Sequence, residues 1–314
     1  MKVALLRCCT TPIFLKQYET STNAVLAKLG MTIVGDAEFN CCGYPLRNFN
    51  RKAYVLASAR NLALAERRSL DVLTVCNCCY GSLKHAEHIM KKDGALREET
   101  GRTLAKEGLR YDGRITAKHL LQVLYHDIGI DKIKQRLQRT FHGLKIATHY
   151  GCHLLRPKEI VAFDNPFAPV KFDQLVEVTG AKSIAWPAKL DCCGSPLWGV
   201  NNELSMALTE KKLVSAKSAG ADYLCAACSY CQLQFDRIQK AMLPRIGPEK
   251  QLPSILYTQL LGLCLGVDED TLGLNQNQLP AGGVLRFLET TEPTLGSGKQ
   301  SAPGMHDQAI TSLS

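Results

Sequence analysis

The stretch CCGYPL at residues 41–46 returns as CCGSPL at residues 192–197, and this repetition organises the chain. In each copy a lone cysteine comes first, Cys9 or Cys152, and a Cys-x-x-Cys pair comes last, at 76–79 or 228–231. The paired cysteines are offset by 151 residues (41 to 192), the Cys-x-x-Cys pairs by 152 (76 to 228) and the lone cysteines by 143 (9 to 152). A constant order at nearly constant spacing predicts two duplicated halves.

The segments between the cysteines alternate between strand-like and helix-like patterns. Apolar, strand-like runs fall at 3–6, 31–34 and 71–75 in the first half and at 145–148, 182–186 and 221–224 in the second. Residues 51–68 and 203–219 repeat apolar residues at helical spacing, and Gly30 and Gly180 suit helix C-caps. The pattern predicts an α/β fold in which each half has a mostly parallel sheet with flanking helices. The cysteines of each half should line the carboxyl edge of its strands.

The predicted domains are residues 1–143 and 144–275, followed by a C-terminal extension, residues 276–314. Residues 84–140 are rich in charge and are expected to form helices that link the halves. From residue 282 the chain turns polar, with many Gly, Pro, Ser, Thr and Gln residues. Because such a segment has little apolar surface to bury, we expect it to be flexible from about residue 290.

Composition narrows the class of protein. A chain of 314 residues with 46% hydrophobic content can bury a sizeable core. The opening run MKVALLRCC is too short for a signal peptide, and no apolar stretch has the length of a membrane span, so we expect a cytoplasmic protein that is not integral to a membrane. The net charge is +9, but lysines and arginines are dispersed in short doublets such as Lys211-Lys212, which favours no nucleic-acid partner.

The 14 cysteines point to metal or redox chemistry, because the cytosol keeps thiols reduced. Zinc is one alternative, but it normally takes two Cys-x-x-Cys half-sites, and adjacent cysteines point in divergent directions. Thiolates at neighbouring positions fit better around a cluster of several irons. The run from Cys225 through Cys228 to Cys231 resembles the opening of a ferredoxin motif, but the fourth cysteine and its proline are missing. No GxxxxGK[ST] or GxGxxG motif for a nucleotide or flavin is present.

The two cysteine sets resemble the CCG domains of the heterodisulfide reductase B-type subunit family. The likeness covers about residues 1–275 and includes VCNCCYGSL at 75–83, HYGCH at 149–153 and CQLQFD at 231–236. It implies two noncubane 4Fe-4S clusters with five cysteine ligands each. The implied front ligands are Cys9, Cys41, Cys42, Cys76 and Cys79, and the implied rear ligands are Cys152, Cys192, Cys193, Cys228 and Cys231.

The resemblance also implies a function. Such a protein cleaves or forms a disulfide at its clusters, with electrons from a flavoprotein resembling the family's A-type subunit and a ferredoxin-like protein resembling its C-type subunit. The chain departs from the family pattern at Cys78, where a small residue is usual, and in SPLWGVNN at 195–202. The substrate is therefore left open as a small disulfide or thiol. An electron relay without a substrate and a zinc-stabilised interaction module are the alternatives.

Four cysteines and several histidines remain to be placed. Cys8 and Cys78 adjoin ligand positions and are alternative ligands, whereas Cys225 and Cys264 are expected to be buried apolar residues. We predict that His149 and His153, which flank Cys152, are the catalytic residues that supply protons, with a structural role as the alternative. His85 and His88 are expected at the surface.

Overall fold

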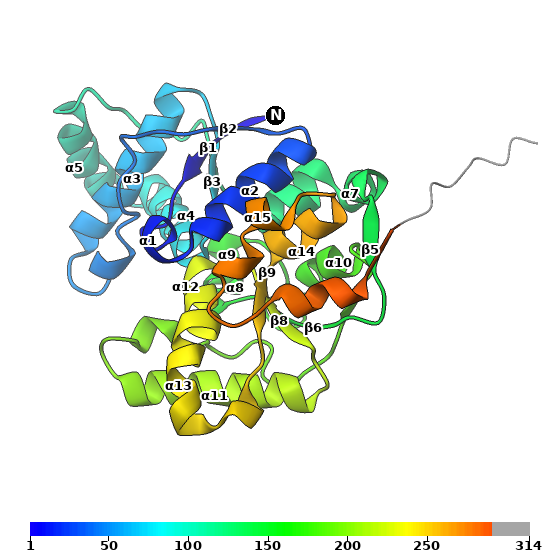
Figure 1. Ribbon diagram of the computed structural model, residues 1–314. Helices are drawn as coiled ribbons and strands as arrows, with labels where there is room; N and C mark the ends of the chain where they lie inside the picture. Colours follow the sequence, from blue (N-terminus) through cyan, green and yellow to red (C-terminus); the bar gives the residue numbers. More distant parts are fainter. Residues whose placement is uncertain (291–314) are drawn as a thin grey trace, which may run out of the picture.

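The computed structural model describes residues 1–290 and contains two four-stranded parallel sheets, one in each half. The first sheet has the order β2-β1-β3-β4 and the second β7-β6-β8-β9, so the two sheets have the same topology (Figure 1). The first comprises β1 (Lys2–Leu6), β2 (Thr32–Val34), β3 (Val72–Thr74) and β4 (Ala117–His119). The second comprises β6 (Lys145–His149), β7 (Lys182–Ser183), β8 (Tyr223–Ala226) and β9 (Ser254–Leu256). The predicted duplicated α/β fold is confirmed.

Helices connect the parallel strands on both sides of each sheet. The first half contains α1 (Thr11–Phe14), α2 (Lys16–Lys28), the 3-10 turn η1 (Tyr44–Leu46), α3 (Arg51–Arg67), α4 (Asn77–Lys92) and α5 (Gly94–Ala105). The second contains α8 (Cys152–Leu155), α9 (Lys158–Val161), α10 (Lys171–Glu177), η3 (Ser195–Leu197), α11 (Asn202–Ser218), α12 (Ser229–Leu233), the π-helical turn η4 (Gln234–Ile238), α13 (Gln239–Ile246) and η5 (Pro248–Lys250). Gly30 and Gly180 follow α2 and α10 with φ of +78° and +87°, as a helix C-cap requires.

The segment between the halves is more varied than the sequence predicts. Residues 84–140 complete α4 and form α5, but they also supply β4, α6 (Leu120–Gln122), the π-helical turn η2 (Val123–Ile128), α7 (Ile130–Arg136) and β5 (Arg139–Phe141). The prediction of linking helices alone was therefore wrong, because β4 is a strand of the first sheet, parallel to β3. Strand β7 is also shorter than the predicted run at 182–186.

The chain beyond β9 returns to the middle of the molecule. It forms α14 (Tyr257–Cys264), α15 (Glu269–Leu272), η6 (Leu274–Gln276), η7 (Gly282–Phe287) and β10 (Leu288–Thr290). Strand β10 pairs antiparallel with β5, with Leu288 opposite Phe141. Residues 288–290 are therefore held by a long-range strand pair. The flexibility expected from about residue 290 concerns a segment outside the described residues.

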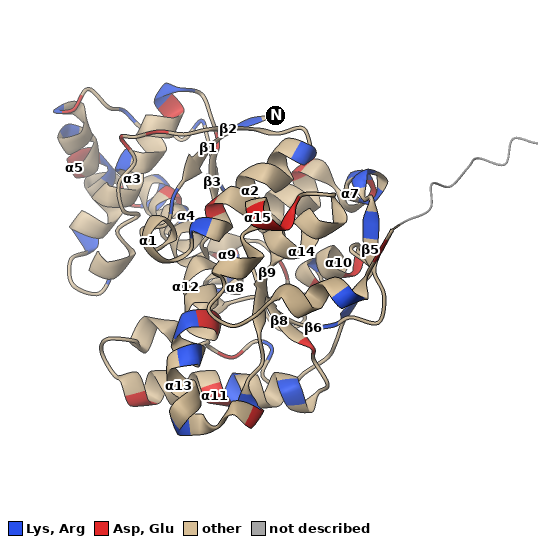
Figure 2. Ribbon diagram, viewed as in Figure 1, with Lys and Arg blue, Asp and Glu red and all other residues tan. Residues whose placement is uncertain are grey.

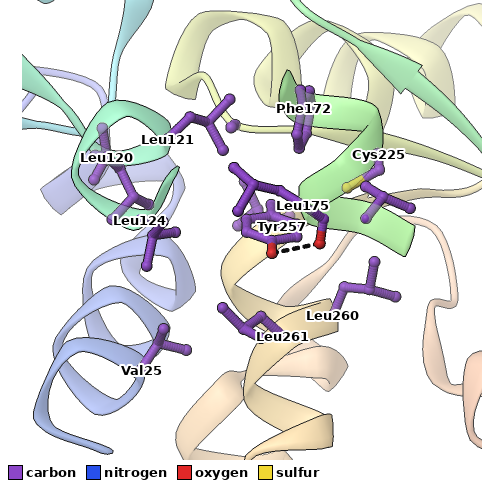
Figure 3. Packing of buried hydrophobic residues seen from close by; sticks show 14 of the residues in the cluster. Val25, Leu120, Leu121, Leu124, Phe172, Leu175, Cys225, Tyr257, Leu260 and Leu261 are labelled. Carbon is purple, nitrogen blue, oxygen red and sulfur yellow. Dashed lines mark hydrogen bonds between the residues drawn. The ribbon is translucent and has the colours of Figure 1, made fainter. Parts of the chain in front are cut away.

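The two halves share one hydrophobic core (Figure 3). Val25 of α2 faces Leu261 of α14, and Leu121 and Phe172 close the same cluster from either half. The Tyr257 hydroxyl donates a hydrogen bond to the backbone oxygen of Leu175 at 2.6 Å. Because these side chains are withdrawn from water together, burial of the core fixes the halves against each other, and with them the loops that carry the cysteines.

Candidate metal centre

The cysteines lie in the loops and helix starts that follow the strands, at the carboxyl edge of each sheet. The lone cysteines, Cys9 and Cys152, follow β1 and β6. The Cys-x-x-Cys pairs begin at Cys76 and Cys228, which precede α4 and α12 as N-cap residues. The two edges meet, because the backbone N–H of Asn77 donates to Sγ of Cys228 at 3.4 Å. The duplication thus places two cysteine groups side by side at the centre of the molecule.

The glycine of each Cys-Cys-Gly lets its loop press against the following helix. Gly43 and Gly194 have φ of +82° and +90°, a region that side chains strongly disfavour. A Cβ atom at position 194 would lie 2.4 Å from the backbone oxygen of Ser205, and one at position 43 would lie 2.9 Å from that of Tyr54. Only glycine allows both the turn and this close approach, which explains its place after each cysteine pair.

A hydroxyl group fixes each cysteine pair from the facing helix. The Ser58 hydroxyl donates to the backbone oxygen of Cys42 at 2.6 Å. In the other half the Thr209 hydroxyl donates to the backbone oxygen of Cys193 at 2.9 Å. Both donors lie sixteen residues after their acceptors, so the two halves hold their cysteine pairs by the same bond.

The front group gathers six thiols rather than five. Sγ atoms of Cys8, Cys76 and Cys79 all lie within 4.8 Å of one another. Cys42 is buried beside Cys79, whereas Cys9 and Cys41 are exposed. They open into a broad cavity of about 850 Å³, which Arg7, Glu19 and Phe39 also line. The structure therefore brings Cys8, an alternative ligand from the sequence, into contact with the predicted set.

The rear group is tighter and includes a histidine. Sγ atoms of Cys193 and Cys231 are 3.6 Å apart, and Nε2 of His149 lies 3.3 Å from Sγ of Cys231. Cys152 and Cys192 are half-buried beside them. The predicted rear cysteines are thus brought together, and the predicted catalytic residue His149 touches one of them.

The thiols of each group are too close to ionise together. Hydrogen bonds from Cys42 and Cys9 lower the pKa of Cys41 to about 2, and the pKa values of both neighbours are raised in turn. In the rear group the bonds from Cys152 and Cys193 likewise lower the pKa of Cys192 to about 2. Like charges in one site force such proton sharing unless a cation binds. A soft, positively charged multi-iron group fits these residues, since it would allow all the thiolates to form at once.

His153 lies between Cys78 of the first half and Cys152 of the rear group, at the wall of a second cavity. Its Nδ1 lies 3.4 Å from Sγ of Cys78 and 3.8 Å from Sγ of Cys152. Nη1 of Arg47 lies 3.0 Å from its Nε2, and since a guanidinium only donates, the ring carries its proton on Nδ1. The cavity measures about 240 Å³ and is lined also by Tyr44 and Arg156.

Comparison with known proteins fits this geometry. The profile of a family described as "Cysteine-rich domain" (CCG) matches residues 3–84 and 146–236, one match in each half. The B-type subunit of the ferredoxin/F(420)H(2)-dependent CoB-CoM heterodisulfide reductase of Methanosarcina acetivorans is 38% identical over 283 residues, which cover 88% of this chain and 94% of the relative. The chain belongs to the heterodisulfide reductase B-type subunit family. As a member of that family it is an iron–sulfur redox subunit.

Other known proteins also resemble this chain, in sequence or in fold. The "8-methylmenaquinol:fumarate reductase membrane anchor subunit" of Wolinella succinogenes is 30% identical, with 83% of this chain and 91% of the relative covered. In fold, the chain resembles a hypothetical protein from Helicobacter pylori, with a TM-score of 0.70 at 16% identity over 88% of this chain and 51% of that one. Within residues 1–290, no helix combines the length and apolarity that a membrane crossing needs.

The structure separates the two predicted catalytic histidines. His153 faces the cavity, whereas His149 is 1% exposed and lies against the rear sulfurs and the ring of Phe235. Cys225 and Cys264 are fully buried, as predicted. The sequence analysis missed Arg47, although a cation four residues after the Cys-Cys-Gly was a signal that could have indicated it.

Proposed function

We propose that the chain is the iron–sulfur subunit of a heterodisulfide reductase-like complex, which reduces or forms a disulfide at two noncubane 4Fe-4S clusters. The observation that carries the proposal is the cavity at His153, a residue whose Nδ1 lies near Sγ of Cys78 in the first half and Sγ of Cys152 in the second. Cys78 and His153 line it, and the same two residues line a smaller cavity of about 10 Å³ together with Cys193 and Cys228. A sulfur compound entering between Arg47 and Arg156 would meet Cys78 and His153, and the His153 ring reaches Sγ of Cys152.

The residues that would hold the clusters are the ten predicted cysteines. When bound, the clusters would supply electrons and iron positions that capture sulfur. Reduction of a disulfide to two thiols takes two electrons and two protons, so a proton donor beside the sulfurs is needed. Among the donors and cations that line the cavity are His153, Arg47 and Arg156.

His153 is suited to pass a proton to a thiolate. Burial opposes protonation of its ring, but the hydrogen bond to Cys78 and the negative charges of Cys78 and Cys228 together outweigh burial and raise the pKa of His153. The ring can take a proton at Nε2, on the side of Arg47, and release the proton on Nδ1 toward the sulfurs. The second proton would come from water, because the cavity is open.

The electrons are proposed to come from a flavoprotein resembling the family's A-type subunit and a ferredoxin-like protein resembling its C-type subunit. The chain has no nucleotide or flavin motif of its own. The exposed thiols of Cys9 and Cys41, in their broad cavity, support an electron entry at the front group. Electron transfer between proteins requires such a short path from the surface to the cofactor.

An electron relay is the second candidate function. The cavity between the two groups measures only about 10 Å³, room for about one water molecule and too little for a disulfide. In a relay, electrons would enter at the front group, cross to the rear group through the contact between Asn77 and Cys228, and leave to another protein of the complex. Neither His153 nor Arg47 would then affect the rate.

Iron analysis and paramagnetic resonance distinguish the candidates. We expect about eight irons per chain in anaerobically purified protein, and a signal after mild oxidation that changes when a thiol or disulfide is added. The Cys152→Ser variant should lose that response, whereas Cys225→Ala, a buried control outside both groups, should keep it. Eight irons with no response to any thiol would favour the relay. Zinc with little iron would overturn both proposals and leave an interaction module.

A further inference from the structure

The two halves differ in charge at equivalent positions beside their cysteines. Strands β1 and β6 are in register with an offset of 143, which pairs Leu6 with His149. Helices α3 and α11 are related by an offset of 151, which pairs Asn61 with Lys212. The matching bonds from the Ser58 and Thr209 hydroxyls confirm that register. Each pair thus sets an uncharged front residue against a titratable rear one.

Lys212 is a buried cation without a carboxylate partner. Its side chain is 0% exposed, although α11 carries charged residues of both signs (Figure 2). Nζ donates to the backbone oxygens of Ala188 and Asp191 and lies 4.5 Å from the ring centroid of Trp186. The carboxylate of Asp191 pairs instead with Lys211, and no carboxylate in residues 1–290 forms an ion pair with Lys212.

The structural task of Lys212 does not need a charge. In the front half Asn61 is equally buried, and its Nδ2 donates to the backbone oxygen of Asn40, the counterpart of Asp191. A neutral amide therefore donates a hydrogen bond to the matching backbone oxygen of the front loop. A buried unpaired cation is costly, so the charge at position 212 calls for a negative group nearby.

The negative groups that act on Lys212 are the rear thiols, Cys193 most strongly, and the carboxylate of Asp191. Burial lowers the pKa of Lys212 to about 8, and the charges of Cys193, Asp191 and Cys231 oppose that shift. With thiolates bound to a cluster, the counter-charge of Lys212 would be the cluster site itself. At the matching position beside the front group stands the neutral, buried Asn61.

His149 is a second residue that favours negative charge at the rear group and has no counterpart at the front group. Its Nδ1 is buried and has no hydrogen-bond partner. A proton on Nδ1 would leave an N–H group unsatisfied, whereas a proton on Nε2 leaves only the lone pair of Nδ1 unsatisfied, so the neutral ring carries its proton on Nε2. Nε2 then donates to Sγ of Cys231 at 3.3 Å. At the matching front position, Leu6 has no donor.

We infer that Lys212, supported by the N–H of His149, makes the rear cluster the one with the higher reduction potential, so that electrons entering at the front collect at the rear. The inference rests on the proposed pair of clusters. Reduction adds negative charge to a cluster, and a fixed cation or an N–H donor beside its sulfurs stabilises that charge, more strongly in a buried site than in water. Lys212 touches no substrate in this scheme and acts only through the potential of the cluster.

The test is a redox titration of the assembled complex, followed by paramagnetic resonance, with the two residues exchanged. In Lys212→Asn we expect the higher of the two midpoint potentials to fall. The electron distribution between the clusters should change at least about tenfold, which corresponds to a fall of about 59 mV for a one-electron couple. The lower potential should stay. Asn61→Lys should raise the lower potential, and Lys211→Asn, which removes the neighbouring exposed cation, should change neither.

Several results would overturn the inference. Two midpoints that coincide in the wild-type complex, a Lys212→Asn shift confined to the lower midpoint, an equal shift of both, or no shift would each do so. Iron content separates this failure from that of the proposed function. A variant with full iron and unchanged potentials refutes only the role of Lys212, whereas a wild-type chain without two iron–sulfur clusters refutes the proposed function and the inference together.

Discussion

Replacing Gly194 by alanine should disable the rear group through the backbone alone. A residue with a side chain at φ of +90° costs about 1–2 kcal/mol. The new Cβ would also lie 2.4 Å from the oxygen of Ser205, about 1 Å short of ordinary contact at 3.4 Å, so the start of α11 must move. Overpacking of this kind costs about 1–3 kcal/mol more. The expected destabilisation is therefore about 2–5 kcal/mol.

The chain provides a matched control for the conformational part of that cost. Gly220 has φ of +85°, but a Cβ there meets nothing within 4 Å, so Gly220→Ala should cost only about 1–2 kcal/mol. Gly43→Ala, with a contact of 2.9 Å, should fall between the two. Urea unfolding of the metal-free chains measures these differences, and iron per chain after anaerobic reconstitution should fall to about half in Gly194→Ala. Equal stabilities of Gly194→Ala and Gly220→Ala would refute the close-approach argument.

Three further changes test the site and the core. Cys9→Ser should lower iron from about eight to about four atoms per chain, while Cys8→Ser keeps it, and the reverse result would make Cys8 the ligand. Since an acid acts below its pKa, disulfide reduction should decline as pH rises through the raised pKa of His153. Cys78→Ser should move that decline to lower pH. His153→Gln should remove the decline and slow the reaction about 100-fold or more. Tyr257→Phe leaves a buried carbonyl unpaired and should cost about 1–3 kcal/mol in urea unfolding, without loss of iron.

Local patterns made much of the fold predictable. The strands that lead to Cys9 and Cys152 and the helices that follow each Cys-Cys-Gly come from hydrophobic periodicity, and the duplication supports each assignment twice. Strands β4 and β9 have three residues each, too few for a period to show, and their pairing with β3 and β8 is non-local. The same holds for β10, which pairs with β5, more than a hundred residues earlier.

The grouping of the cysteines was predictable from the sequence, and the residues that surround them were not. Cysteine spacing alone grouped the ten thiols, but nothing local distinguished Lys211 from Lys212 within their doublet. The helix decides this, because successive residues point about 100° apart, so Lys211 reaches water and Lys212 reaches the interior. In the same way His149 and His153 lie on one short segment, yet the strand buries the first against a sulfur and α8 turns the second toward a cavity.

Duplication explains why the differences between the halves matter more than their likeness. Whatever both halves retain, such as the Cys-Cys-Gly turn and its hydroxyl clamp, serves the common task of holding thiols. The common task does not require the differences between matched residues, and three such pairs lie beside the cysteine groups: Leu6 with His149, Asn61 with Lys212, and Cys8 with Gly151. Two identical clusters in contact would share electrons equally and give them no direction. A cation and an N–H donor placed on one side only supply that direction, since they lower the energy of the reduced state in the half that holds them.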